Sequence, residues 1–310
     1  MDHNNKTKIV TITLNWNGLL HTLTCLKSLK DTNVCIDSIV VDNFSEDSSV
    51  EYIKKYFPSV KVIENSSNLG YSKGYNVGIK EALKLKYDFF IIHNNDVKVA
   101  PDSIEALVNV AKSSPRIGVV TGKVYHYNDR DRFQYAGGRH QKPSGLLGQP
   151  IGANEIDYGQ YNEPFELDNA DDVLMLVKRE VIEKVGMYSS SFFLYFEETD
   201  WCERIKRANY KLIYTPHARV WHKGSVSTGG GTNPVKLFWY TRNSYVFAKR
   251  NYNLPLLLRF LFNTLFSKFI KQSVAYICKK RLNLLLPLVK GHLSGLKALI
   301  STDSLVNYGS

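Results

Sequence analysis

The feature that most constrains the fold is a regular alternation of short apolar strands with helical segments near the start of the chain. β-Branched or aromatic runs predict four buried strands, at residues 8–14, 37–42, 60–64 and 87–92. Segments with apolar residues at helical spacing lie between them, at residues 21–30, 48–57 and 75–85. This order predicts an α/β fold with a mainly parallel sheet flanked by helices. Ligands of such a sheet bind beyond the carboxyl ends of its strands, so the loops after the strands are the candidate site.

The charge of the chain is concentrated in its last quarter. The 310 residues contain 40 Lys and Arg against 29 Asp and Glu, a net charge of +11. Residues 236–310 hold twelve of the bases and a single acid, Asp303, so residues 1–235 are neutral overall. We therefore expect an α/β domain over residues 1–230 and a basic, apolar helical tail over residues 231–310, with the glycine run at 229–231 as the hinge.

The composition of the tail favours a lipid or protein surface over nucleic acid as its partner. Its most apolar segment, residues 253–270, is interrupted by Arg259 and Lys268, which argues against a transmembrane span. Amphipathic helices at an anionic membrane surface fit this pattern, and so does a helical subdomain or an oligomer interface. We expect no nucleic-acid partner, because the bases alternate with Leu and Phe and no reader motif is present.

The cysteines and the N-terminus predict a cytoplasmic protein. Four cysteines are scattered without a CxxC pair, which argues against a zinc module and a secreted disulfide framework: Cys25, Cys35, Cys202 and Cys278. The first residues lack the apolar core of a signal peptide. Together with the basic tail, this predicts a cytoplasmic location, with peripheral contact at the inner face of the cell membrane as an option.

Carboxylates follow two of the predicted strands. Asp96 comes directly after the apolar strand and an Asn-Asn pair, where it can bind a divalent cation shared with phosphate or simply form a turn. Asp42 ends the second strand, where it can contact a nucleotide or cap the next helix. Each residue alone leaves both alternatives open.

The richest cluster of acids follows an aromatic run. Residues 192–196 are apolar or aromatic, and Glu197, Glu198 and Asp200 come next. A carboxylate beside aromatic walls loses solvation, which raises its pKa toward that of a general base. The alternative is a charged first helical turn with pairs at i,i+4, and both descriptions can hold together.

Three further segments are candidates for ligand contact. The glycine-rich stretch 68–78 enters a helix and resembles a phosphate-binding turn, although it is neither GxGxxG nor a Walker loop. His222 follows a strand-like run and is either a metal ligand or a structural histidine. The polar region 126–165 predicts a long active-site loop or an insertion with short strands.

Taken in order, these pieces resemble the family 2 glycosyltransferases of GT-A fold, in particular the rhamnosyltransferase-like branch of bacterial polysaccharide and O-antigen synthesis. The matching motifs are NWNG at 15–18, VDN at 41–43, NLG at 68–70 with Gly74, Asn76 and Gly78, NND at 94–96, FFLYFEETDW at 192–201, WHKGS at 221–225 and YTRN at 240–243. The resemblance spans about residues 8–250.

The resemblance implies an inverting transfer from a nucleotide-diphospho-sugar, dTDP-rhamnose or a UDP-sugar, to a saccharide or lipid-linked saccharide. It implies that Asp42 contacts the nucleotide base and that Asp96 binds Mn²⁺ or Mg²⁺ with the diphosphate. It makes Glu198 the catalytic base, His222 a further metal ligand and Arg242 a contact of the diphosphate. Position 198 departs from the family pattern, because Asp is usual there.

The remaining site predictions follow from the same resemblance. Donor-binding residues are expected at Asn15, Asn17, Asn68, Gly70, Asn76 and Asn95. Glu197 and Asp200 are expected to support the base. Asp171, Asp172 and Trp201 are acceptor candidates, and Asp172 stands where a small residue is commoner.

Two other functional classes remain open at this point. The fold can serve a non-catalytic nucleotide-sugar-binding assembly subunit, and the basic tail leaves a nucleic-acid-binding protein as a weaker alternative. The joint presence of Asp96, Glu198 and His222 favours the enzyme. The sugar, the acceptor hydroxyl and the oligomeric state are not predicted.

Overall fold

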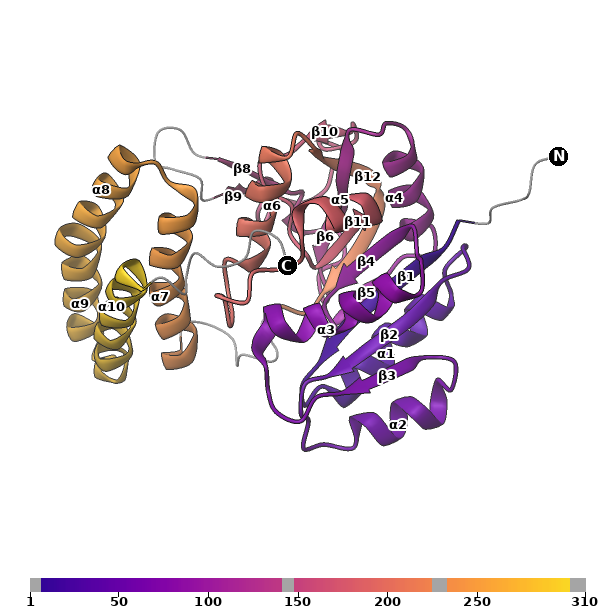
Figure 1. Cartoon of the computed structure of the whole chain (residues 1–310), viewed down its shortest axis with the longest axis horizontal. Helices are drawn as coiled ribbons and strands as arrows, with labels where there is room; N and C mark the ends of the chain where they lie inside the picture. Colours follow the sequence, from indigo (N-terminus) through magenta and orange to yellow (C-terminus); the bar gives the residue numbers. More distant parts are fainter. Residues whose placement is uncertain (1–6, 141–147, 225–232, 302–310) are drawn as a thin grey trace.

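A computed structural model of the chain describes residues 7–140, 148–224 and 233–301. A broad sheet with helices on both faces forms one body, and a layer of helices from the C-terminal part stands beside it (Figure 1). The predicted boundary at residue 230 and the glycine hinge lie outside the described residues, so the two-domain division stays a prediction.

The main sheet has ten strands in the order β10-β12-β6-β11-β4-β1-β2-β3, with β5 paired to β12 and β7 paired to β6. The strands are β1 (Ile9–Asn15), β2 (Asp37–Asp42), β3 (Lys61–Glu64), β4 (Phe89–His93), β5 (Val97–Val99), β6 (Ile117–His126), β7 (Phe133–Tyr135), β10 (Phe165–Glu166), β11 (Leu174–Lys178) and β12 (Lys211–His222), and β8 (Gly138–His140) pairs with β9 (Gly148–Pro150) in a separate hairpin. The predicted parallel sheet is confirmed over β3, β2, β1 and β4. β11 enters antiparallel between β4 and β6.

Helices follow the strands as the periodicity predicts. They are α1 (Leu19–Lys30), α2 (Ser49–Tyr56), α3 (Gly70–Lys84), α4 (Ser103–Lys112), α5 (Arg179–Val185), α6 (Glu197–Arg207), α7 (Pro234–Asn251), α8 (Leu254–Phe262), the π-helix η1 (Asn263–Lys268), α9 (Phe269–Cys278), the 3₁₀ turn η2 (Leu282–Leu284) and α10 (Leu285–Ile300). The described part of the tail is helical, as expected.

Alternating strand residues build one core on each face of the sheet. In β4, Phe90 and Ile92 face α3, α5 and α6, whereas Phe89 and Ile91 face α1, α2 and α4. All four side chains are buried, because helices cover both faces. This two-sided burial explains the nearly continuous apolar run that marked the strand in the sequence.

Helix α3 begins five residues earlier than predicted, and its glycines serve packing. A Cβ at Gly74 would collide with Leu14, and one at Gly78 would collide with Ile12. The glycines therefore let α3 lie directly on β1. Periodicity alone missed this first part of the helix because glycine is a poor helix former.

The C-terminal helices pack tightly among themselves and against the sheet body. α10 crosses α7 where Gly291 and Gly295 leave no room for a Cβ beside Thr241 and Tyr245. On the other side, Phe247 of α7 joins Phe192 and Phe196 in a small apolar cluster. The helical layer is thus attached directly to the segment that carries the acidic cluster.

Candidate active site

Asp96 and His222 meet where β4 and β12 end. The Asp96 Oδ1 atom lies 3.1 Å from His222 Nε2, and both side chains are largely shielded from solvent. Gln134 of β7 orients the histidine: its Oε1 accepts from His222 Nδ1 at 2.8 Å, and its Nε2 donates to the backbone oxygen of the same residue at 2.7 Å. Burial alone would raise the pKa of Asp96, but His222 holds the pKa below its usual value.

This arrangement suits a divalent cation. Because Nδ1 donates to Gln134, Nε2 is the ring nitrogen that His222 directs at the Asp96 carboxylate, with Asn94 Nδ2 3.3 Å from it. In its unprotonated form this nitrogen can coordinate a cation together with the carboxylate. The oxygen and nitrogen donors match the preferences of Mn²⁺. Among the described residues, no group of three His, Cys, Asp or Glu side chains gathers to hold a metal. A bound ion would therefore take its other ligands from substrate phosphate and water.

Asp42 belongs to a polar network at the ends of β1 and β2. Its Oδ2 accepts from Asn15 Nδ2 at 2.8 Å, and its Oδ1 accepts from the Ser45 backbone at 2.9 Å. Thr22 donates to Asn15 Oδ1 at 2.6 Å, and Asn95 Nδ2 donates to the Thr22 hydroxyl at 3.0 Å. Asn15 and Asp42 at two strand ends, Asn95 after β4 and Thr22 of α1 are thus brought together at one edge of the sheet.

Asn17 and Asn68 shape the loops around this network. Asn17 Oδ1 accepts from the Glu46 backbone at 2.7 Å, and Asn68 Oδ1 accepts from Asn43 Nδ2 at 2.9 Å. Donor contact by these two residues stays a prediction.

Gly70 and Asn76 make packing contacts in the structure, and the donor roles predicted for them stay predictions. A Cβ at Gly70 would strike Phe193, and the next residue, Tyr71, donates its backbone N–H to Phe193 O at 2.7 Å. Asn76 uses both amide atoms on the Tyr188 backbone, at 2.8 and 3.1 Å. The first turns of α3 therefore hold the segment before α6.

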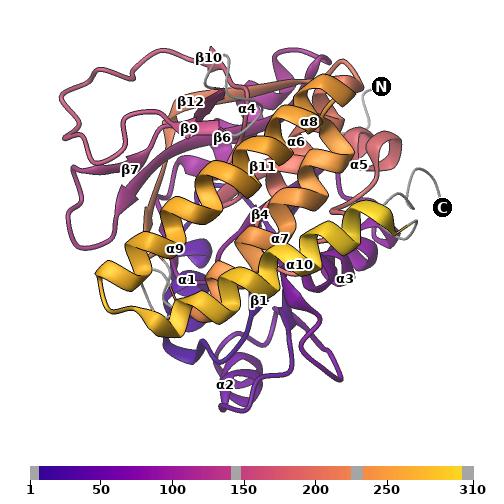
Figure 2. The same ribbon diagram turned by 90° about the vertical axis from the view of Figure 1, so that its left-hand side faces the viewer.

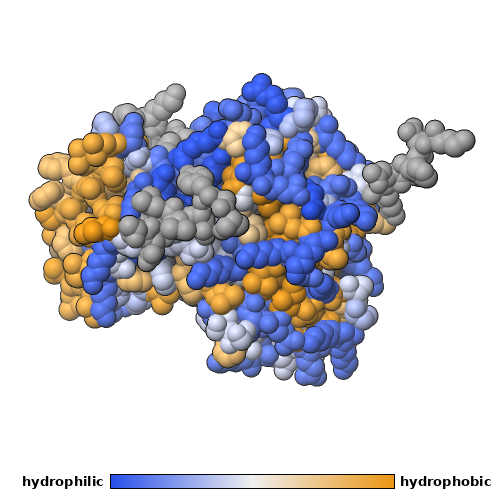
Figure 3. Space-filling model, in the orientation of Figure 1, coloured by the Kyte–Doolittle hydropathy of each residue, from blue (hydrophilic) through white to orange (hydrophobic). Residues whose placement is uncertain are grey.

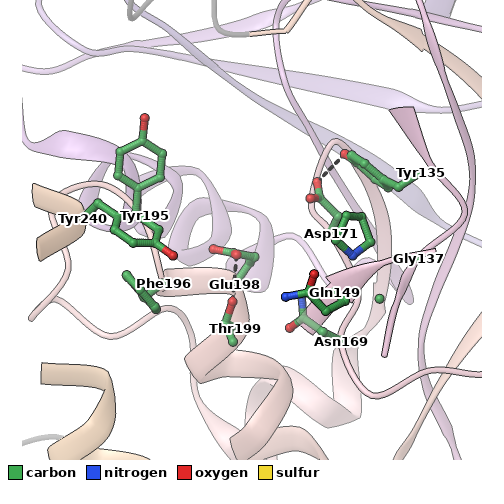
Figure 4. A pocket seen from close by; sticks show the side chains of 12 residues that line it. Tyr135, Gly137, Gln149, Asn169, Asp171, Tyr195, Phe196, Glu198, Thr199 and Tyr240 are labelled. Carbon is green, nitrogen blue, oxygen red and sulfur yellow. Dashed lines mark hydrogen bonds between the residues drawn. The ribbon is translucent and has the colours of Figure 1, made fainter. Parts of the chain in front are cut away.

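Glu198 lines a pocket of about 350 Å³ at the start of α6 (Figure 4). Aromatic side chains form one wall and polar groups form the opposite wall. The lining residues are Tyr135, Gly137, Gly138, Gln149, Pro150, Asn169, Asp171, Tyr195, Phe196, Glu198, Thr199 and Tyr240. Of these, only Glu198 and Asp171 were predicted, since Tyr240 lies far along the chain and Gln149 lies in the irregular polar region.

The pocket raises the basicity of Glu198. Loss of solvation, and then the nearby Asp171 carboxylate, raise the pKa of Glu198 to about 7, although the Thr199 hydroxyl donates to Glu198 Oε1 at 2.8 Å. Asp171 accepts from the Tyr135 hydroxyl at 2.7 Å, which fixes it across the pocket. A carboxylate with a pKa near neutrality has the protonation behaviour of a general base.

Two neighbouring acids lie beneath the pocket, outside its lining. Glu197 and Asp172 are only 4 % and 7 % exposed, and burial raises the pKa of both well above the usual range. Tyr188 donates to Asp172 Oδ2 at 2.6 Å, whereas Glu197 Oε2 has no hydrogen-bond partner. Neither side chain lines the pocket, so the acceptor role of Asp172 and the supporting role of Glu197 stay predictions.

Trp201 and Asp200 are structural. Trp201 is fully buried and its Nε1 donates to Gly186 O at 2.8 Å, so it does not line the described pocket, and the predicted acceptor role stays a prediction. Asp200 pairs with Arg204 at 2.9 Å and with Arg250 at 2.8 Å, and these charges hold its pKa below the usual value despite burial. It supports the site by fastening α6 to α7.

The segment before α6 is strained and held by α7. Tyr195 and Phe196 both adopt left-handed φ angles, 71° and 73°, which are unusual for aromatic residues. Asn243 Nδ2 donates to Leu194 O at 2.7 Å, and Arg242 donates to Ser191 O at 2.6 Å. Arg242 thus braces this segment, and its contact with the diphosphate stays a prediction.

The β7 strand connects the two candidate centres. Gln134 contacts His222, and its neighbour Tyr135 contacts Asp171 in the Glu198 pocket. Tyr71 makes a second connection. Its hydroxyl donates to Asn94 Oδ1 at 2.9 Å, beside Asp96, and its backbone N–H donates to Phe193 O in the segment before α6. Asp96 itself does not line the described pocket. A single cleft shared by Asp96 and Glu198 stays a prediction.

The fold and these two centres define the class of the protein. A parallel α/β sheet with acidic residues after β4 and an acidic helix start facing a pocket is the architecture of a GT-A glycosyltransferase. The family model for glycosyl transferase family 2 matches residues 9–186, more than half of the chain. The chain belongs to this family, as the sequence motifs predicted.

Curated relatives and solved structures agree with this assignment. An N-acetylglucosaminyl-diphospho-decaprenol L-rhamnosyltransferase of Mycobacterium tuberculosis is 27% identical over 68% of this chain and 74% of its own length. A dTDP-rhamnosyl transferase, RfbF, of Shigella flexneri is 25% identical over 81% of this chain and 82% of its own. The crystal structure of GalNAc-T7 with UDP, GalNAc and Mn²⁺ has a TM-score of 0.62 at 19% identity, over 80% of this chain and 51% of that one.

Proposed function

We propose that this glycosyltransferase moves a sugar, with inversion, from a nucleotide-diphospho-sugar to a saccharide acceptor bound in the Glu198 pocket. The observation that carries the proposal is a single carboxylate with a raised pKa facing a pocket that has one aromatic wall and one polar wall. Aromatic faces stack on sugar rings, and amide and carboxylate groups accept from hydroxyls. The pocket therefore suits an acceptor sugar.

The donor is proposed to bind at the adjoining strand ends. The polar network of Asn15, Asp42 and Asn95 shapes the nucleotide side, and Asp96 and His222 would hold Mn²⁺ or Mg²⁺ with the diphosphate. Such an ion, when bound, stabilises the negative charge of the leaving group. Asp96 supplies an anionic ligand, and Gln134 keeps Nε2 of His222 directed at the same point.

Glu198 is proposed to remove the proton from the attacking hydroxyl. In its ionised form it accepts that proton as the oxygen bonds to the anomeric carbon, on the side opposite the leaving diphosphate. A positioned general base contributes about 10²–10⁴-fold to a rate. Asp171 and Tyr135, fixed across the pocket, orient the acceptor.

The relatives favour a rhamnosyl donor and a role in cell-surface polysaccharide synthesis. Both curated relatives described above are named as rhamnosyltransferases, and one is named for a lipid-linked diphospho-sugar. We propose dTDP-rhamnose as the first donor to test and a diphospho-lipid-linked saccharide as the acceptor. UDP-sugars are the alternative donors.

Two variants test the proposal with separate measurements. Glu198→Gln is expected to lower turnover at least 100-fold, while binding of nucleotide and Mn²⁺ by calorimetry stays near that of the wild type. Asp96→Asn is expected to weaken the binding itself. Wild-type turnover in Glu198→Gln would refute the base assignment, and absence of turnover with every donor in the wild type would favour the non-catalytic assembly subunit.

A further inference from the structure

Helices α8, η1 and α9 present a row of large apolar side chains to solvent. These seven side chains are 53–68% exposed, and we call them the apolar stripe: Leu254, Leu258, Phe262, Phe266, Ile270, Val274 and Ile277. The opposite side of the same helices is used for packing, since Phe269 and Tyr276 of α9 pack against the buried cluster of Leu237, Leu284 and Leu288. Figure 2 shows α8 and α9 at the outside of the helical layer, and Figure 3 shows hydrophobic residues across this end of the molecule.

The π-helix keeps the apolar stripe aligned. Six of its members follow at four-residue intervals, and each such step turns by about 40° around a regular α-helix. The row would therefore wind away from one side over its length. The wider turn of η1, between Phe262 and Phe269, rotates the row back in the other direction. The backbone irregularity thus serves a continuous apolar surface.

The charges around the apolar stripe are all positive. Residues 236–301 contain twelve Lys and Arg and no Asp or Glu. Eight of these bases are exposed: Arg259, Lys268, Lys271, Lys279, Lys280, Arg281, Lys290 and Lys297. Elsewhere the surface carries both signs, so the helical layer is complementary to an anionic partner.

We propose that the apolar stripe and these bases dock onto an anionic phospholipid bilayer. Interfacial helices insert apolar side chains at the headgroup boundary and place Lys and Arg among the headgroups. No described helix has the length and apolarity to cross a membrane. A second copy of the chain is a poorer occupant, because a two-fold contact through this surface would set positive charge against positive charge.

The docked layer would bring the acceptor pocket close to the lipid. Tyr240, which lines the pocket, lies on α7; α8 packs on this helix, and α9 packs on α10, which crosses α7. One helix layer measures about 10 Å, so the pocket would stand within a few helix diameters of the headgroups. This consequence rests on the proposed lipid-linked acceptor, whereas the docking itself does not.

Vesicle sedimentation of the full chain tests the docking directly. We expect binding to phosphatidylcholine vesicles that contain phosphatidylglycerol, and weak binding to phosphatidylcholine alone. F262S/F266S is expected to lower the partition coefficient by about tenfold or more. K279Q/K280Q/R281Q is expected to lower it by about 100-fold at low salt.

Matched variants on the sheet body serve as controls. Y52S/Y56S removes two exposed aromatic residues, also four apart, from α2, and K27Q/K30Q/K86Q removes three exposed bases. Both are expected to bind vesicles like the wild type. Equal loss in test and control variants would overturn the proposal. So would a wild-type dimer that F262S/F266S converts to monomer without any change in vesicle binding.

The experiment separates docking from catalysis. Donor hydrolysis without vesicles measures the transferase chemistry, and F262S/F266S is expected to retain it together with the wild-type circular dichroism spectrum. Vesicle binding that persists in Glu198→Gln would support docking even if the proposed base were wrong. Vesicle binding that is absent in a wild type with active chemistry would refute the docking alone.

Discussion

Replacing Glu198 by Gln should make the protein more stable above neutral pH while it loses activity. The folded chain raises the pKa of Glu198 from 4.5 to about 7. Below pH 4.5 the group is protonated in both the folded and the unfolded state. As pH rises through 7, the folded protein must ionise a carboxyl in poorly solvated surroundings, and the stabilising contribution of the bound proton is lost. Gln is neutral at every pH and avoids that cost.

The expected gain in stability follows from the shift in the pKa of Glu198. A difference between 4.5 and about 7 corresponds to about 3 kcal/mol at pH 8. Glu198 is half-buried on the wall of an open pocket, so solvent screens part of this energy, and we expect about 1–2 kcal/mol. The amide oxygen of Gln keeps the contact with Thr199. The melting temperature should therefore rise by a few degrees.

Thermal unfolding at several pH values between 4 and 8 measures the gain in melting temperature of Glu198→Gln over the wild type. The gain should be absent near pH 4 and complete near pH 8. Glu105→Gln, an exposed residue of α4, is the control and should change nothing. A variant that matches the wild type at pH 8, or that gains equally at pH 4, would refute the assigned environment of Glu198.

Three further variants probe the packing and the metal site. Asp200→Ala leaves Arg204 and Arg250 without their shared carboxylate, and the free energy of unfolding in urea should fall by about 3–5 kcal/mol; an unchanged urea midpoint would contradict this. Gly295→Ala drives a Cβ into the Tyr245 ring, and thermal unfolding should show a loss of about 1–3 kcal/mol; a neutral effect would mean that α10 and α7 can separate freely. Gln134→Leu removes the acceptor of His222 Nδ1, and calorimetry should show Mn²⁺-dependent nucleotide binding weakened about 10–100-fold. Gln134→Glu keeps an acceptor and should retain more of this binding. Equal binding by the wild type and both variants would exclude the orienting role.

The front of the fold could be predicted from the sequence because its central strands, β1 and β4, are buried on both faces. Residues 89–92 form a continuous apolar run and residues 39–41 a shorter one, and the structure places them in β4 and β2. The antiparallel insertion of β11 could not be predicted, since the residues of a strand do not reveal the direction of its neighbours. The start of α3 was missed because its glycines serve close packing on β1, a tertiary demand that opposes helix propensity.

The site was predictable where a functional group follows a strong element. Asp96 and Glu198 come directly after an apolar strand and an aromatic run, and the structure gives both the expected partly enclosed surroundings. Gln134 lies in the polar region 126–165 and Tyr240 in the YTRN motif, but neither residue was assigned a role, because long-range folding alone brings each side chain to its place. The motif resemblance assigned Arg242 to the donor, but its guanidinium is used on a backbone oxygen.

The two left-handed aromatic residues before α6 make the C-terminal helices a support of the Glu198 pocket. Such a turn persists only while its surroundings hold it, and Arg242 and Asn243 of α7 supply that restraint. A chain cut after residue 232 would keep every acid of the site. The turn at Tyr195 and Phe196, which presents Glu198, would however lose this restraint. A smaller protein made by removing the helices would then lose its activity. Any force that a bilayer exerts on those helices would reach Glu198 through the side chains of Arg242 and Asn243.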